Sequence, residues 1–97
     1  MITESQARII ATQYLEILES DIGDLLTIID KETIEKSFGW IFFYNSKKYL
    51  ESGELSYMLA GNAPFIVSRV SGDIQEMGTA KPIDEYISEY EARWVGM

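Results

Sequence analysis

The sequence predicts an α+β fold, in which a small antiparallel sheet of about four strands is flanked by an N-terminal and a C-terminal helix. Amphipathic helical patterns stand at both ends of the 97-residue chain, and short apolar stretches that alternate with period two lie between them. A hydrophobic content of 46% with 25% charged residues is that of an ordinary globular protein. Residues 1–97 are therefore expected to form a single domain with one modest core.

The N-terminal helix is predicted to begin at Thr3, because the Thr3 hydroxyl and the Gln6 amide have the spacing of a capping box. Apolar residues then recur at steps of three and four down to about Ser20, which places them on one face. The predicted buried face contains Ala7, Ile10, Ala11, Tyr14, Leu15 and Leu18. Residues 21–24 supply the turn that follows.

Residues 25–37 alternate in the manner of a half-exposed strand or hairpin arm. Residues 40–45 are the most aromatic stretch and are predicted to be the central strand. The alternation sends Trp40, Phe42 and Tyr44 to one face and Ile41 and Phe43 to the other. A strand that is apolar on both faces is covered on both, or meets a partner on one of them.

Residues 46–61 fit neither period and are expected to form a folded-over loop with a helical turn. Pro64 cannot donate to a ladder, so it suits the first residue of a strand. Ser71-Gly72 is typical of a two-residue hairpin, and residues 73–77 form the returning strand. The stretch Gly61-Asn62-Ala63-Pro64 is interpreted as a rigid entry to this hairpin.

The last helix is predicted to begin at Pro82, which is favoured at a first helical position, and Asp84 and Glu85 suit its first turn. Its predicted buried face contains Ile83, Tyr86, Ile87, Tyr90 and Trp94. The acids of this helix, Glu89 among them, face solvent.

Composition excludes several classes of function. The chain has no cysteine and no histidine, which rules out disulfides, thiolate zinc sites and histidine-based catalysis. Residues 61–64 lack the glycine spacing and the lysine of a phosphate-binding loop, and no acidic cluster has EF-hand spacing. No catalytic residue, metal site or cofactor is expected. An enzyme would need a carboxylate such as Glu35 or Glu76 with its pKa raised by burial.

A net charge of −8 repels phosphate backbones and anionic lipids, so neither nucleic acid nor a membrane surface is expected as a partner. The excess of acids lies in residues 1–45 and 82–97. This excess of negative charge either keeps the protein soluble or attracts a basic protein partner. No apolar stretch approaches the roughly 20 residues of a membrane helix, and the N-terminus lacks the basic region of a signal peptide, which favours the cytoplasm.

The aromatic residues of the central strand have two interpretations. They form core, or they are the centre of a protein-binding face. Two helices on one side of the sheet would leave its other side to residues 46–61 or to a partner. Aromatic residues would then hold the partner while acids steer its approach. The candidate partner-binding residues are Trp40, Phe42, Tyr44, Tyr49, Tyr57, Met58, Asp84, Glu85 and Glu89.

The segments "GWIFFYNSKKYLESGE" and "LAGNAPFIVSRVSGDIQEMGTAKPIDEYISEYE" resemble the YrhB-domain family, also described as the immunity protein 35 family. This resemblance runs from about Gly39 to Glu91. It implies a small bacterial cytoplasmic protein of α+β fold, found in polymorphic toxin systems, that binds and neutralises a toxin domain without enzymatic activity. The partner would be a protein, such as a basic toxin domain, bound by a monomer or homodimer. A holdase-type chaperone, which would use the same apolar face for many clients, is the alternative.

Overall fold

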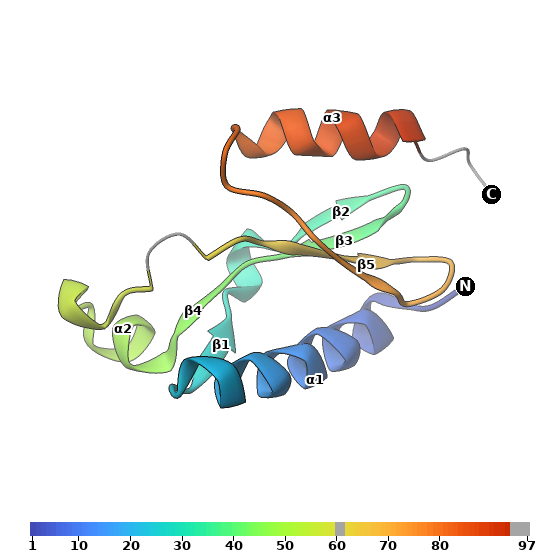
Figure 1. The fold of residues 1–97 in the computed structure, drawn as a ribbon. Coiled ribbons are helices and arrows are strands. Elements are labelled where there is room, and N and C mark those ends of the chain that lie inside the picture. Colours follow the sequence, from blue (N-terminus) through green and yellow to red (C-terminus); the bar gives the residue numbers. More distant parts are fainter. Residues whose placement is uncertain (60–61, 94–97) are drawn as a thin grey trace.

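The computed structural model describes residues 1–59 and 62–93, which form an α+β fold with a helix at each end of the chain (Figure 1). Its elements are α1 (Glu4–Ile22), β1 (Leu26–Ile28), η1 (Asp30–Glu32), β2 (Ile34–Lys36), β3 (Gly39–Phe42), β4 (Tyr44–Ser46), α2 (Lys47–Ser52), η2 (Leu55–Tyr57), β5 (Phe65–Ser68), β6 (Ile74–Glu76) and α3 (Ile83–Arg93). Four strands form an antiparallel sheet in the order β2-β3-β5-β6, and β1 pairs separately with β4. The predicted fold class is confirmed. Among the described residues, no helix has the length and apolar character needed to cross a bilayer.

The two long helices cover opposite faces of the four-stranded sheet (Figure 1). The arrangement considered for the binding interpretation, with both helices on one side of the sheet, is therefore wrong. The reason is the alternation in the central strand, which gives each helix its own apolar face. On the α1 side, the core contains Ala7, Ala11, Leu15, Trp40, Phe42, Tyr44, Phe65 and Val67. On the α3 side, it contains Phe38, Ile41, Ile66, Met77 and Ile87.

Helix α1 begins and ends close to where the sequence predicts. The Gln6 N–H donates to the Thr3 hydroxyl at 3.2 Å and the Thr3 N–H donates to the Gln6 side chain at 2.9 Å, which completes the capping box. The helix runs to Ile22, and the Gly23 N–H closes it by donating to the Glu19 carbonyl at 2.8 Å. Small side chains at two of its three buried positions let the helix lie close to the sheet.

Residues 25–37 form two strands rather than the single strand predicted. β1 and β2 belong to different sheets, and the short helix η1 separates them. The aromatic strand is likewise divided at Phe43, because β4 leaves the main sheet to pair with β1. The Ile29 N–H donates to the Phe43 carbonyl at 2.8 Å at this branch point. The predicted alternation of side chains nevertheless holds from Trp40 to Tyr44.

Two asparagines hold the segment between β4 and β5 in place. Asn45 accepts hydrogen bonds from the N–H groups of Ser46 and Leu59 at 2.7 and 2.9 Å. Asn62 donates to the Tyr44 carbonyl at 2.7 Å. Residues 46–59 contain α2 and η2, in agreement with a folded segment that includes a helical turn. Gly61 lies outside the described residues.

The β5–β6 hairpin is present, but its loop is longer than two residues. The Ser68 N–H donates to the Asp73 carbonyl at 2.9 Å, so residues 69–72 form the loop. Helix α3 follows and turns its predicted face to the sheet, with Ile87 buried and Ile83, Tyr86 and Tyr90 partly buried. Trp94, predicted on the same face, lies outside the described residues.

Candidate protein-binding site

The three strand aromatics proposed for partner binding are buried. Trp40, Phe42 and Tyr44 are 1%, 1% and 8% exposed, and all three pack in the core on the α1 side. Of the two interpretations, core or protein-binding face, the three side chains therefore fit the core. A partner does not reach these side chains unless α1 moves away from the sheet.

A second group, in α2 and η2, is exposed. Helix α2 begins after Ser46, whose hydroxyl accepts from the Tyr49 N–H at 3.3 Å, and ends after Ser52. Neither α2 nor η2 has a buried residue, so their apolar side chains stand at the surface. We call this group the α2–η2 surface, and it consists of Leu50, Leu55, Tyr57 and Met58. Their exposed fractions are 39%, 73%, 42% and 43%. The predicted Tyr49 lies beside them and is partly buried.

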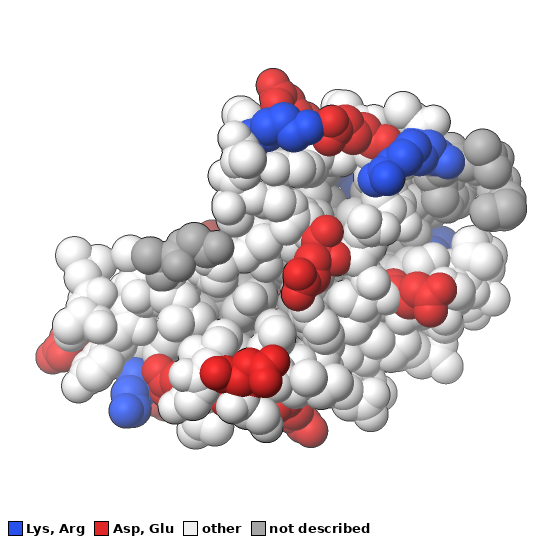
Figure 2. Space-filling view, in the orientation of Figure 1, with Lys and Arg blue, Asp and Glu red and all other residues white. Residues whose placement is uncertain are grey.

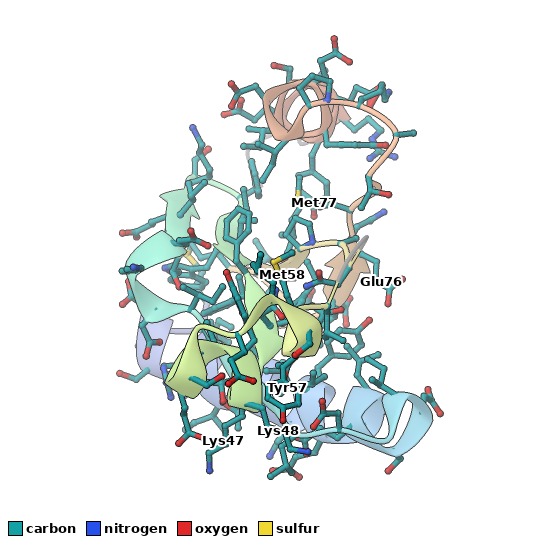
Figure 3. All side chains as sticks on the ribbon, turned by 90° about the vertical axis from the view of Figure 1, so that its left-hand side faces the viewer. Lys47, Lys48, Tyr57, Met58, Glu76 and Met77 are labelled. Atoms are coloured by element: carbon teal, nitrogen blue, oxygen red, sulfur yellow. The ribbon has the colours of Figure 1, made fainter. Side chains whose placement is uncertain are left out.

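Lysines flank the α2–η2 surface, as Figure 3 shows for Lys47, Lys48, Tyr57 and Met58. The Lys48 ammonium lies 5.6 Å from the centre of the Tyr57 ring, within range of a cation–π interaction. A hollow of about 550 Å³ lies between these lysines and the end of α1. The two acids on its α1 side already accept hydrogen bonds from the backbone. The Leu26 N–H donates to Glu19 at 2.8 Å, and the Leu25 N–H donates to Asp24 at 2.9 Å.

The predicted acids lie on the exposed side of α3. Asp84 and Glu85 occupy its first turn, which is the end of α3 that lies toward α2 in Figure 1. Glu89 is engaged in an ion pair with Lys81, which partly neutralises its charge. Figure 2 shows acidic side chains along α3 with basic ones near both of its ends. The structure thus brings Tyr49, Tyr57 and Met58 together and places the acids on the other side of the sheet.

The acidic side chains of the described residues were also candidates for catalysis or metal binding. Within residues 1–59 and 62–93, no three acidic side chains come together as a metal site would require. Glu35 has a 59% exposed side chain and pairs with Arg69 at 2.8 Å. Glu76 is also exposed and accepts the Tyr14 hydroxyl, and burial of Tyr14 together with this bond raises the Tyr14 pKa. Neither carboxylate has the burial that the enzyme alternative requires.

Sequence reasoning missed two members of the α2–η2 surface, Leu50 and Leu55. They lie in a stretch without clear periodicity, where neither helix nor strand spacing says which way a side chain points. The signal that could have identified them is the absence of helix or strand periodicity in residues 46–61. Six- and three-residue helices cannot bury a continuous apolar face, so apolar residues within them tend to remain exposed.

Comparison with known proteins shows one matching family and one related protein. The family model for immunity protein 35 matches residues 5–93. The chain is 39% identical over 93 residues to "Uncharacterized protein YrhB" of Escherichia coli (strain K12), and the match covers 96% of this chain and 93% of that protein. No solved structure is significantly similar. Both similarities extend from α1 to α3.

Proposed function

Because the chain belongs to the immunity protein 35 family, we propose that it binds and neutralises a bacterial toxin in the cytoplasm, with no catalytic activity of its own. The observation that carries this proposal is a family match over residues 5–93, which reaches from α1 through α3. We further propose that residues 1–97 act as one domain and that a protein–protein interface, rather than a pocket, performs the neutralisation.

The α2–η2 surface is the proposed contact for the toxin. Exposed tyrosine and methionine side chains are enriched in protein interfaces, and a few such anchors supply most of the binding energy. Tyr57 combines a half-exposed ring with a nearby lysine, so it offers both apolar area and a polar hydroxyl. Tyr57 lies in a short helix between Tyr44 and Leu59, whose backbone groups are hydrogen-bonded to the side chains of Asn62 and Asn45. These bonds keep the surface preformed.

Acids of α3, across the sheet from this surface, are proposed to attract the toxin. Asp84 and Glu85 are exposed in the first turn of α3, which is the end of that helix toward α2, and the chain carries a net charge of −8. Long-range attraction between a negative surface and a basic partner accelerates association more than it strengthens the final complex. Glu89 contributes less, because Lys81 already pairs with it.

Replacing Tyr57 with alanine is expected to abolish capture of the toxin while the fold is retained. The affinity loss for an interface anchor is about 2 kcal/mol or more, which is roughly a thirtyfold rise in Kd. The measurement is affinity capture from a lysate of the source cell, including its secreted toxin candidates, with identification by mass spectrometry. Val70→Ala is the matched control, since Val70 is also 42% exposed but lies in the β5–β6 loop.

One dominant toxin that is retained by Val70→Ala and lost by Tyr57→Ala supports the proposal. A broad set of unfolded clients would contradict it and indicate a holdase. Equal capture by both variants would show that the α2–η2 surface is not the contact.

Neutralising Asp84 and Glu85 together, as Asp84→Asn and Glu85→Gln, is expected to slow association with the captured toxin several-fold at low salt. The difference should vanish at high salt, where the two charges are screened. Stopped-flow or surface-based kinetics at two salt concentrations measure it. The control replaces Glu4→Gln and Glu91→Gln, two exposed acids at the start of α1 and near the end of α3, and thus removes the same charge from the end of the molecule opposite α2 (Figure 1). An association rate that does not depend on salt contradicts the steering role.

A further inference from the structure

The strand β6 forms one edge of the four-stranded sheet, and β5 is its one neighbour within the described residues. It is the front strand of the sheet in Figure 1 and follows the β5–β6 loop. An uncovered edge presents backbone N–H and C=O groups that can pair with another chain. Gln75 and Glu76 are exposed here, and Ile74 is partly buried.

The register fixes which backbone groups of β6 are free. Ser68 and Met77 donate to the carbonyls of Asp73 and Pro64, both at 2.9 Å, which marks two hydrogen-bonded pairs of the antiparallel ladder. Such pairs alternate along the ladder, so Gln75 bonds to β5 while Ile74 and Glu76 direct their N–H and C=O groups outward. Within the described part of the chain, these outward groups have no backbone partner.

A hollow of about 210 Å³ lies directly beside this edge, between β6 and α3. Tyrosine side chains separate the helix from the sheet here. The Tyr86 hydroxyl accepts from the Ala80 N–H at 3.1 Å and lies 2.3 Å from where a Cβ on Gly78 would stand. Gly78 therefore lets the Tyr86 ring lie against the backbone that leaves β6. The hollow has room for side chains of an added strand that face α3.

The charges at this edge are predominantly negative. Asp73 and Glu76 flank the free backbone groups, and both are exposed. Of the other charged residues that line the hollow, Glu89 pairs with Lys81 and Arg93 lies 5.8 Å from the centre of the Tyr90 ring on its own helix. Figure 2 views the molecule from this side, and the charged side chains between α1 and α3 are mostly acidic.

We propose that the free edge of β6 receives an extended, basic segment of the toxin as an additional strand, an inference that rests on the proposed function. Backbone hydrogen bonds to Ile74 and Glu76 hold the segment, and alternate side chains enter the hollow under α3. Lysine or arginine on the other face pairs with Glu76, whose side chain lies on the α1 side, and Asp73 adds negative charge at the start of the edge. A second copy of this chain fits poorly as the added strand. Pairing of β6 with β6 would bring the acids of both copies close together, and like charges on neighbouring strands repel.

The test is an NMR titration of the whole protein with the capped peptide Lys-Val-Lys-Val-Lys, which needs no toxin. We expect the amides of Ile74 and Glu76 to exchange rapidly in the free protein and to become protected as the peptide is added. The Met77 amide, already bonded to Pro64, serves as the internal control. The peptide Glu-Val-Glu-Val-Glu should cause no change. Replacing both acids, as Asp73→Asn and Glu76→Gln, should weaken the basic peptide about fivefold.

The control variant Glu51→Gln with Glu54→Gln removes two acids near the α2–η2 surface and should leave the titration unchanged. Peptide-induced shifts centred on the α2–η2 surface, equal effects of both peptides, or β6-to-β6 contacts in a dimer would each overturn the inference. If the titration fails but Tyr57-dependent capture succeeds, the edge proposal alone is wrong. If the titration succeeds but no toxin is captured, the proposed function is wrong, and β6 is a peptide-binding edge without a toxin partner.

Discussion

Replacing Gly39 with alanine is expected to prevent stable folding. A Cβ atom at this position would stand 2.1 Å from the Val67 carbonyl oxygen and 3.0 Å from the Arg69 backbone nitrogen. Both atoms are backbone, and the Arg69 N–H donates to the Phe38 carbonyl at 2.9 Å, so neither can move without breaking the β3–β5 ladder. Gly39 also has a φ of +151°, which side chains disfavour. We expect a loss above about 4 kcal/mol, most of the stability of a small domain.

Urea unfolding followed by circular dichroism measures this effect, and Gly53→Ala is the control. Gly53 also has a positive φ, +73°, but no atom lies within 4 Å of its added Cβ. Its replacement should cost only about 1 to 2 kcal/mol for the left-handed backbone. Similar losses at the two positions would show that backbone conformation, and not the collision with β5, sets the requirement for glycine at Gly39.

The parts of the fold that local chemistry specifies were predictable. The capping box at Thr3 and the proline before α3 located both helices, and alternation assigned the faces of Trp40 and Ile41. The side of the sheet that each helix covers was not predictable, because periodicity shows that a face is apolar but not what lies against it. The division of residues 25–37 into β1 and β2 was not predictable either. A strand of three residues is too short for its alternation of apolar and polar residues to be told apart from the sequence of a loop.

The candidate site was predicted in part for a related reason. An aromatic residue in a strand and one in a short helix look alike in sequence, yet Trp40 is buried and Tyr57 is half exposed. Burial depends on which layers meet, which is a property of the whole fold. The ion pair that occupies Glu89 also escaped prediction, because Lys81 precedes the helix and lies eight residues away. The free edge of β6 follows only from strand order and register.

Replacing Trp40 with alanine is expected to destabilise the fold by about 3 to 5 kcal/mol, because the indole fills the core between α1 and the sheet. The Arg69 guanidinium lies 4.4 Å from the centre of the ring and loses that contact as well. Trp40→Phe should cost far less. Phenylalanine keeps most of the apolar volume, and it removes a buried indole N–H that has no acceptor among the described residues.

This pair of variants separates a core role from a binding role for Trp40. If Trp40 acts only through the core, Trp40→Phe loses little of its unfolding midpoint and keeps its capture of the toxin, whereas Tyr57→Ala keeps the midpoint and loses capture. A Trp40→Phe protein that unfolds normally but no longer captures the toxin would mean that the indole reaches the partner. Because Trp40 lies beneath α1, that result would require α1 to leave the sheet on binding. Hydrogen exchange of the α1 amides in the complex would then rise, and an unchanged exchange would exclude that movement.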